Sequence, residues 1–205
     1  DNPSEASFVA NEKVIRVLAL AGIPGAMLLH GYVGFIFGAV KAMPWWSTPL
    51  MPVIFILSAI VSGIALIMVL YTLSTFLRGK GVDHPTVIAM SRWLLGFLAL
   101  DLMLEVLEVV TQAYEREESW EMISQLITRV IAVSYLGIQV GMGTLLPLVI
   151  LGVIAARGPK EHLASTLAFL SGSLVLVGVL AMRWNVIIGG QLLSKSLRGF
   201  ASYTP

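Results

Sequence analysis

The 205-residue chain is 57% hydrophobic and only 12% charged, and its mean hydropathy is +0.88. About a quarter of the residues of an ordinary soluble domain are charged, so this composition excludes that class and indicates an integral membrane protein. Long apolar segments in lipid must satisfy their own backbone hydrogen bonds, which predicts an all-α membrane helical bundle. The net charge of +1 indicates that nucleic acid is not a partner of this chain. The absence of cysteine excludes disulfides, cysteine-ligated iron–sulfur clusters and covalently attached haem in this chain.

Long apolar runs predict about five membrane-spanning helices within a single membrane domain, residues 1–205. In chain order the expected spans are residues 14–40, 50–77, 86–114, 130–156 and 163–182. The loops between them are short, so neighbouring helices are expected to run antiparallel and to pack as a bundle.

Glycine and proline mark particular positions in these spans. The run GIPG at residues 22–25 interrupts the first span and predicts a broken helix there. Gly34-x-x-x-Gly38 and Gly137-x-x-x-Gly141 fit the small-residue pattern of close helix contacts.

The ends of the spans give an orientation. Basic residues favour, by seven to six, a cytoplasmic location for the side that carries residues 13–16, 78–80 and 157–160. Trp45 and Trp46 follow the first span and are interpreted as interfacial anchors. The chain begins at Asp1 without a signal-peptide pattern, which predicts a processed chain or a portion of a longer protein.

Asp101, Glu105 and Glu108 lie inside the third apolar run. Their spacing of i, i+4 and i+7 places them on one face of a helix. An ionisable group at bilayer depth costs about 2.5–3.5 kcal/mol, so the stripe is expected to face the bundle interior or a wet cavity. The functional interpretation is a proton path or a contact to a polar ligand. The structural alternative is that an arginine or hydroxyl groups of a neighbouring helix satisfy the carboxylates.

His30 is the only histidine expected deep in the membrane, because His84 and His162 lie at loops or helix starts. A haem with two axial histidines is therefore not expected within this chain. His30 fits a hydrogen-bond donor to a quinone or quinol oxygen, and the structural alternative is a hydrogen bond to a neighbouring helix.

Several polar residues have structural interpretations. Ser58 and Ser62 are expected to bond back to their own helix, and Gln139 to bridge two helices. In RWNVIIGGQ, residues 183–191, the two glycines are expected to end the helix. Arg183, Asn185 and Gln191 then belong to a solvated helix end, a partner interface or a pocket rim. Phosphate-loop, dinucleotide, zinc-ligand and nucleophile patterns are absent from the sequence, and no metal site is expected.

Four stretches together resemble the NrfD/PsrC family, the membrane subunits of polysulfide-reductase-type respiratory complexes. They are HGYVGFIFGAVKAMPWW (30–46), LMPVIFILSAIVSGIAL (50–66), DLMLEVLE (101–108) and RWNVIIGGQ (183–191). The first and last strings are most similar to the branch found with sulfite-reductase-associated and hydrogenase-associated complexes.

This resemblance implies a haem-free, quinone-interacting, multi-pass subunit of a bacterial or archaeal cytoplasmic (inner) membrane. Family members exchange electrons between menaquinone or ubiquinone and a ferredoxin-like iron–sulfur subunit, and a further catalytic subunit acts on the terminal substrate. They have eight to ten spans in two four-helix bundles, so five spans cover part of that pattern.

The leading hypothesis is a quinol/quinone-interacting subunit of a respiratory oxidoreductase complex. Asp101, Glu105 and Glu108 would carry protons. The residues expected around the quinone are His30, Tyr32, Asp101, Arg183, Asn185 and Gln191. One alternative is a secondary transporter or proton-translocating subunit without a quinone site, and another is a structural anchor for an electron-transfer subunit.

Overall fold

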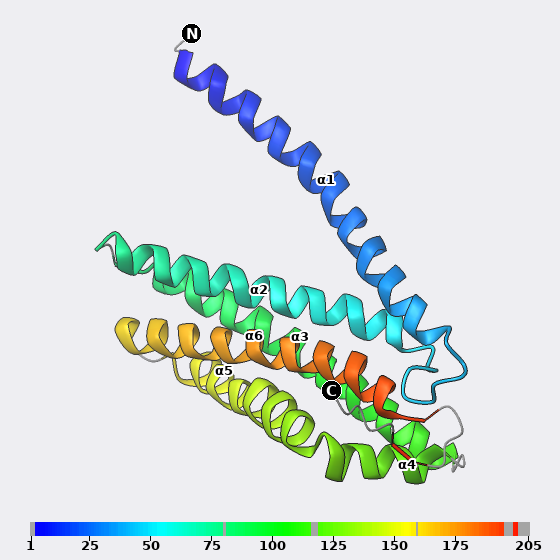
Figure 1. The fold of residues 1–205 in the computed structure, drawn as a ribbon. Helices are drawn as coiled ribbons and strands as arrows, with labels where there is room; N and C mark the ends of the chain where they lie inside the picture. Colours follow the sequence, from blue (N-terminus) through cyan, green and yellow to red (C-terminus); the bar gives the residue numbers. More distant parts are fainter. Residues whose placement is uncertain (1–2, 80, 116–118, 159, 195–198, 201–205) are drawn as a thin grey trace.

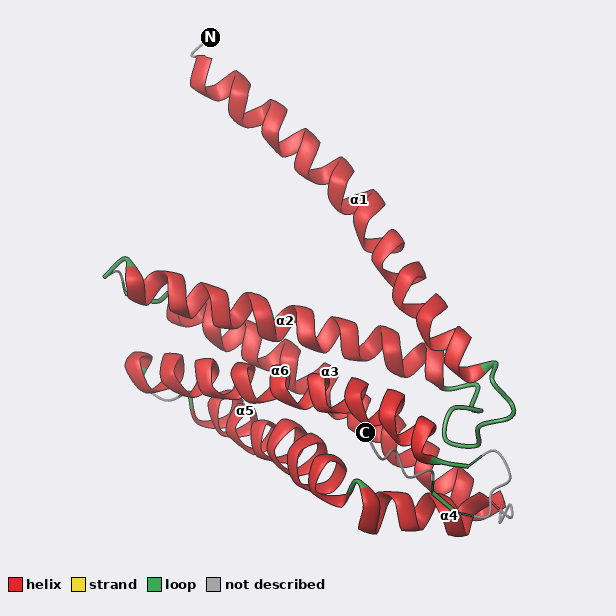
Figure 2. Ribbon diagram, in the orientation of Figure 1, coloured by secondary structure: helices red, strands yellow, loops and turns green. Residues whose placement is uncertain are grey.

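The computed structural model describes residues 3–79, 81–115, 119–158, 160–194 and 199–200, and of these it leaves out the side chains of 3–11, 115 and 161. The described residues are almost entirely helical, and none lies in a strand of a sheet (Figure 1, Figure 2). In sequence order the helices are α1 (Pro3–Gly38), α2 (Met51–Leu77), α3 (His84–Glu115), α4 (Ser119–Gln125), the π-helices η1 (Leu126–Val130) and η2 (Val133–Leu145), α5 (Leu146–Arg157) and α6 (Glu161–Leu192). The predicted all-α membrane bundle is confirmed.

Four elements form the bundle: α2, α3, the continuous run of η2 and α5, and α6. They close a ring in which α2 contacts α3, α3 contacts α5, α5 and η2 contact α6, and α6 contacts α2. One apolar core, which includes Met68, Leu94 and Leu151, fills the end of the ring where α6 begins. Two smaller apolar clusters, around Trp45 and around Met51, fill the other end. The polar residues described below lie between these cores.

Helix α1 packs against the outside of α2 and diverges from the bundle toward its N-terminus (Figure 1). Gly34 and Gly38 make the contact, because a Cβ on Gly34 would lie 2.6 Å from the Cα of Pro52 and one on Gly38 would lie 2.8 Å from the Thr48 carbonyl. The predicted close contact at this glycine pair is confirmed.

The predicted break at residues 22–25 is wrong, since α1 continues through Pro24. A helix in lipid cannot leave a set of backbone groups unsatisfied, whereas one proline removes a single hydrogen bond.

The fourth predicted span is irregular. The backbone leaves helical hydrogen bonding near Ile131, continues as the π-helix η2 and becomes α-helical at Leu146. The predicted close contact at Gly137 is wrong, because open space surrounds it. The close crossing with α6 lies one turn later, where a Cβ on Gly143 would overlap the backbone of Gly178.

Helix α6 continues to Leu192, ten residues beyond the expected end of the fifth span, so the prediction that Gly189 and Gly190 end the helix is wrong. These two glycines instead leave room for indole rings. A Cβ on Gly189 would lie 3.2 Å from Nε1 of Trp45, and one on Gly190 would overlap the ring of Trp46.

Four helices of the described residues are long and apolar enough to cross a membrane: residues 12–38, α2, residues 133–157 and residues 162–192. Helix α3, which carries the acidic stripe, is not among these four, but its 32 residues run alongside them within the bundle (Figure 1).

Replacing Gly143 by alanine is expected to destabilise the protein, because the added methyl group cannot fit without separating η2 from α6. Overpacking of this kind costs about 1–3 kcal/mol in the free energy of unfolding. Gly152→Ala is the control, since nothing lies within 4 Å of that position and alanine favours a helix by about 0.5–1 kcal/mol. Thermal unfolding in detergent, followed by circular dichroism, measures the difference. Equal stability of the two variants would contradict the close crossing.

Candidate functional site

The three carboxyl groups of α3 face the interior of the bundle, as their spacing predicts. Asp101 is 6% exposed, and the half-buried Glu105 and Glu108 line a small cavity of about 30 Å³. Each carboxyl group lies within electrostatic range of another charged or ionisable side chain. Glu105 interacts with Asp101 and Glu108, and Tyr135 interacts with both glutamates.

A series of side-chain hydrogen bonds connects Glu105 to two other elements. Gln139 of η2 donates from Nε2 to Oε1 of Glu105 at 3.1 Å. Asn185 of α6 donates from Nδ2 to Oε1 of Gln139 at 2.9 Å, and the Ser134 hydroxyl donates to Oδ1 of Asn185 at 2.6 Å. Every bond therefore points its proton toward Glu105, and the bridging role predicted for Gln139 is confirmed. Linked bonds of this kind polarise one another at low dielectric, which strengthens the terminal bond to the carboxyl group.

Asp101 differs from Glu105 because its Oδ1 is buried without a hydrogen-bond partner in the described structure. The Arg183 guanidinium is within electrostatic range of Asp101. Arg183 donates from Nη2 to the Ser58 hydroxyl at 3.3 Å and lies over the ring of Phe55, 5.1 Å from the centroid. Asp101 consequently keeps an oxygen that a ligand, a water or a proton can occupy.

The cavity beside Glu105 is small and mixed in character. Besides the two glutamates it is bordered by Gln112, Tyr135 and the apolar residues Met51 and Ile54. Oε1 of Gln112 is buried without a partner among the described residues. A volume of about 30 Å³ accommodates about two water molecules with polar partners, and it is far below the roughly 300–1,000 Å³ of a ligand pocket. At this volume the cavity fits water and is too small for a quinone ring in the arrangement described here.

Two tryptophans connect the loop after α1 to the same part of α6. Trp45 donates from Nε1 to the Asn185 carbonyl at 3.2 Å, and Trp46 donates to the Val186 carbonyl at 2.6 Å. Trp45 is only 7% exposed, so its interpretation as an interfacial anchor is wrong. The two indoles hold the loop against the backbone of Asn185, which binds Gln139, and of the next residue, Val186.

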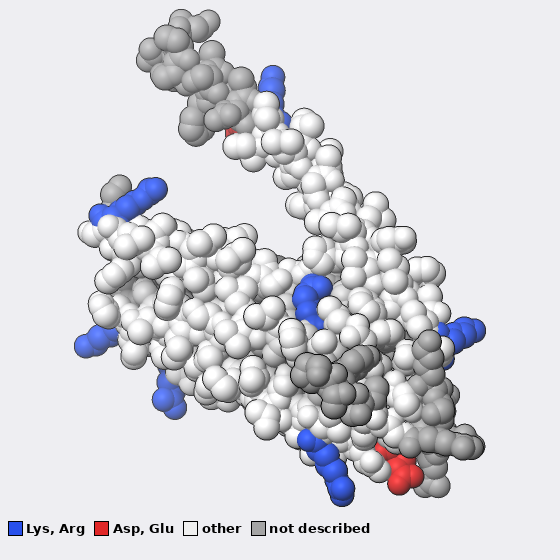
Figure 3. All heavy atoms as spheres, viewed as in Figure 1, with Lys and Arg blue, Asp and Glu red and all other residues white. Residues whose placement is uncertain are grey.

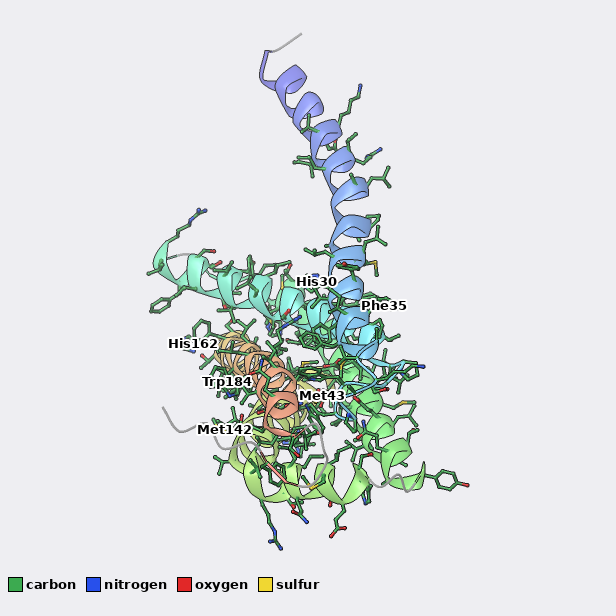
Figure 4. All side chains as sticks on the ribbon, turned by 45° about the vertical axis from the view of Figure 1, so that its right-hand side comes forward. His30, Phe35, Met43, Met142, His162 and Trp184 are labelled. Atoms are coloured by element: carbon green, nitrogen blue, oxygen red, sulfur yellow. The ribbon has the colours of Figure 1, made fainter. Side chains whose placement is uncertain are left out.

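The remaining predicted site residues lie elsewhere. His30 stands on α1 where this helix meets α2, and its Nδ1 donates to the Ala26 carbonyl of its own helix at 2.9 Å (Figure 4). Tyr32 is 63% exposed on α1, and Gln191 is exposed near the end of α6. Helix α2 separates α1 from the acidic stripe, so the structure does not bring His30 and Asp101 together. Asn185 is 1% exposed and lies in the interior, which excludes a partner interface at this residue.

Sequence reasoning missed Ser134, Tyr135, Gln112 and the hydrogen-bonding role of the two tryptophans. Ser134 and Tyr135 stand at the start of a glycine-rich, apolar run. Its polar residues do not recur at α-helical spacing, so the sequence did not indicate that these two side chains face the site. The bonds of Ser58 and Ser62 to carbonyls of their own helix are confirmed. Within the described part of the protein, no group of three metal-ligating side chains is assembled.

Comparison with known proteins places residues 4–194 within the family described as Polysulphide reductase, NrfD, and the chain belongs to this family. The C subunit of selenate reductase from Mesobacillus selenatarsenatis is 31% identical over 180 residues, which cover 87% of this chain and 40% of the relative. The C chain of polysulfide reductase from Wolinella succinogenes is 27% identical over 185 residues, covering 86% of this chain and 54% of the relative. The sequence thus spans about half of these relatives or less. No solved structure matches it. The family resemblance predicted from the sequence is confirmed.

Gln139→Leu is expected to lower the free energy of unfolding by about 1–3 kcal/mol, because leucine leaves Glu105 without its donor and Asn185 without its acceptor. Gln191→Leu is the matched control, because Gln191 is exposed on α6. Unfolding of the detergent-solubilised protein in a denaturant series measures both variants. If Gln139→Leu is as stable as Gln191→Leu, the hydrogen-bond series does not exist in solution.

Proposed function

Because the chain belongs to the polysulphide reductase NrfD family, we propose that it is a quinone-interacting membrane subunit of a respiratory reductase complex. In this proposal it exchanges electrons between menaquinone or ubiquinone in a bacterial or archaeal cytoplasmic membrane and an iron–sulfur partner subunit. The chain has no cysteine, so a cysteine-ligated cluster belongs to the partner. Its relatives are a subunit of selenate reductase and a chain of polysulfide reductase, which supports a complex with a further catalytic subunit.

The observation that carries the proposal is the set of carboxyl groups that α3 turns toward the bundle interior. One oxygen of Asp101 has no partner in the described structure, and Glu105 accepts a hydrogen bond from Gln139. Quinone chemistry moves protons with electrons, and a protein supplies position and proton-transfer groups to such a cofactor. Carboxyl groups buried in a membrane bundle are costly and are typical of proton relays. A purely structural anchor would gain nothing from them.

The proposed proton path follows α3. Asp101, Glu105 and Glu108 are each about one helical turn apart, which is about 4.5–6 Å along the axis. A proton would cross that distance through a water molecule rather than directly. The cavity at Glu105 and Glu108 has room for such a water. Gln112, one turn further, adds a buried oxygen that can accept from a water. The path then continues toward the end of α3 at Glu115.

Asp101 and Arg183 fit the polar partners of a quinone head group, since one keeps an unpaired oxygen and the other is a half-buried cation. When bound there, a quinone would supply the two-electron redox chemistry. Arg183 would orient an oxygen atom of the quinone. Asp101 would exchange a proton with that oxygen on one side and with Glu105 on the other. His30 and Tyr32 lie on the other side of α2 from Asp101 and Arg183, so in this proposal they would contact a quinone at a second position, on the α1 side. Asn185 acts on Glu105 through Gln139, and Gln191 is a proposed contact at the rim.

The irregular backbone at Ile131 supports one alternative, a proton-translocating subunit or secondary transporter without a quinone site. Non-helical backbone at membrane depth is tolerated where it lines a cavity, and transporters use such helices for ion sites. Ion transport into vesicles that contain the complex but no quinol would favour this alternative.

Asp101→Asn and Glu105→Gln, each in the assembled complex, are expected to slow quinol-driven electron transfer at least tenfold. Positioned acid–base groups contribute about 10²–10⁴ in rate, and the amides cannot exchange a proton. Glu121→Gln is the control, because Glu121 is exposed on α4.

The same variants should keep wild-type reduction of the terminal substrate when an artificial donor supplies electrons to the catalytic subunit. That second rate distinguishes loss of proton transfer from loss of assembly. Wild-type quinol-driven rates in both variants would contradict the proposal.

A further inference from the structure

A large groove lies at the opposite end of the bundle from the acidic network. It has a volume of about 780 Å³ and opens between the end of α2, the loop at Gly81 and Val82, and the beginning of α6. This volume lies within the range of small-molecule binding sites. Neither the hydrogen-bond series nor the carboxyl groups of α3 take part in it, so it is independent of the proposed proton path.

One wall of the groove is apolar and accessible. It contains Leu73, Phe76 and Phe169, which are 39%, 78% and 38% exposed. Such side chains, placed on helices that cross a membrane, suit an acyl chain. The wall therefore favours an amphiphile over a small polar ion.

The other wall is polar and carries the Lys160 cation. Lys160 and His162 are both exposed there, and neither side chain has a hydrogen bond or ion pair with the described residues. The Thr72 and Thr166 hydroxyls donate to carbonyls of their own helices, so their protons are not free to bind an anion. Lys160 is also the residue before α6, and its side chain makes no hydrogen bond to the start of that helix, so the free backbone N–H groups there add positive potential. The groove thus presents donors and positive charge to one end of its ligand.

The sequence around the groove is more basic than acidic, with Arg78, Lys80 and Arg157 against Asp83 and Glu161. Arg78 and Arg157 end α2 and α5 at this end of the bundle. Figure 3 shows Lys and Arg side chains projecting there, at the left of the view, with no acidic side chain of the described residues beside them on this face. Asp83, the acidic residue of the adjacent loop, is engaged by the Thr86 hydroxyl and backbone N–H.

We propose that this groove binds an anionic phospholipid, with the phosphodiester at Lys160 and His162 and an acyl chain along Phe76 and Phe169. Basic pockets between membrane helices recognise anionic head groups in this way. The lipid would join α2 to α6 at the end of the bundle that the count of basic residues favours as cytoplasmic. It would stabilise the ring of helices without contact to the acidic stripe.

The test is thermal unfolding of the detergent-purified complex with added phosphatidylglycerol or phosphatidylcholine, in the wild type and in Lys160→Gln/His162→Gln. Phosphatidylglycerol is expected to raise the Tm of the wild type more than phosphatidylcholine does. The double variant should bind it at least fivefold more weakly, because the Lys160 charge alone is worth a factor of about five near an anionic surface. Lys41→Gln, an exposed lysine at the opposite end, is the control and should keep the wild-type response. Thr166→Glu, which puts a carboxylate into the groove, should also abolish the preference for the anionic lipid.

Four results would overturn the proposal. Equal stabilisation by both lipids would show that charge is not recognised, and a wild-type response in both groove variants would place the lipid elsewhere. The same stabilisation by inorganic phosphate would show a phosphate site that does not need a lipid. Displacement of phosphatidylglycerol by an uncharged quinone analogue would assign the groove to a quinone.

Discussion

The burial of Glu105 is the constraint on which the arrangement of the neighbouring elements depends. A carboxyl group inside a membrane bundle has to find partners within the protein, and Gln139, Asn185 and Ser134 provide them in one directed series. The partners reach Glu105 only because η2 lies against α6, and the glycine crossing at 143 and 178 permits that distance. The indoles of Trp45 and Trp46 then hold the loop after α1 against the same turn of α6.

Asp101 and Glu105 have different surroundings, which is the basis for the different roles that we propose for them. Glu105 is held in place by its hydrogen bond, whereas Asp101 keeps a buried oxygen without a partner in the described structure, beside a half-buried arginine. An unpaired buried oxygen costs stability, and such groups in a native fold call for an explanation in function. In the function that we propose, Asp101 would exchange the proton, and Glu105 beside the small cavity would hold it.

Helical spacing was sufficient to predict the interior position of the acidic stripe, because α3 is a regular α-helix and three carboxyl groups cannot face lipid. It was not sufficient for η2. Ser134 and Gln139 are five residues apart, which separates them by about 140° on an α-helix, whereas i→i+5 bonding brings them toward one face. The wrong prediction that Gly189 and Gly190 end α6 has a related reason. A sequence shows that a side chain is missing, but not which distant group fills the space, and here the groups are indoles more than 100 residues earlier. The position of α1 could not be predicted either, because its apolar residues can pack equally well against lipid or against protein.

The central claim is that carboxyl groups of α3 change protonation when the quinone is reduced or oxidised. Infrared difference spectroscopy of the assembled complex, recorded between the oxidised and reduced quinone pool, observes the carboxyl C=O stretch directly. The account predicts a carboxyl band in the wild type that is lost or shifted in Asp101→Asn or Glu105→Gln and unchanged in Glu121→Gln. A wild-type spectrum without a carboxyl band, or a band that persists unchanged in both α3 variants, would contradict it.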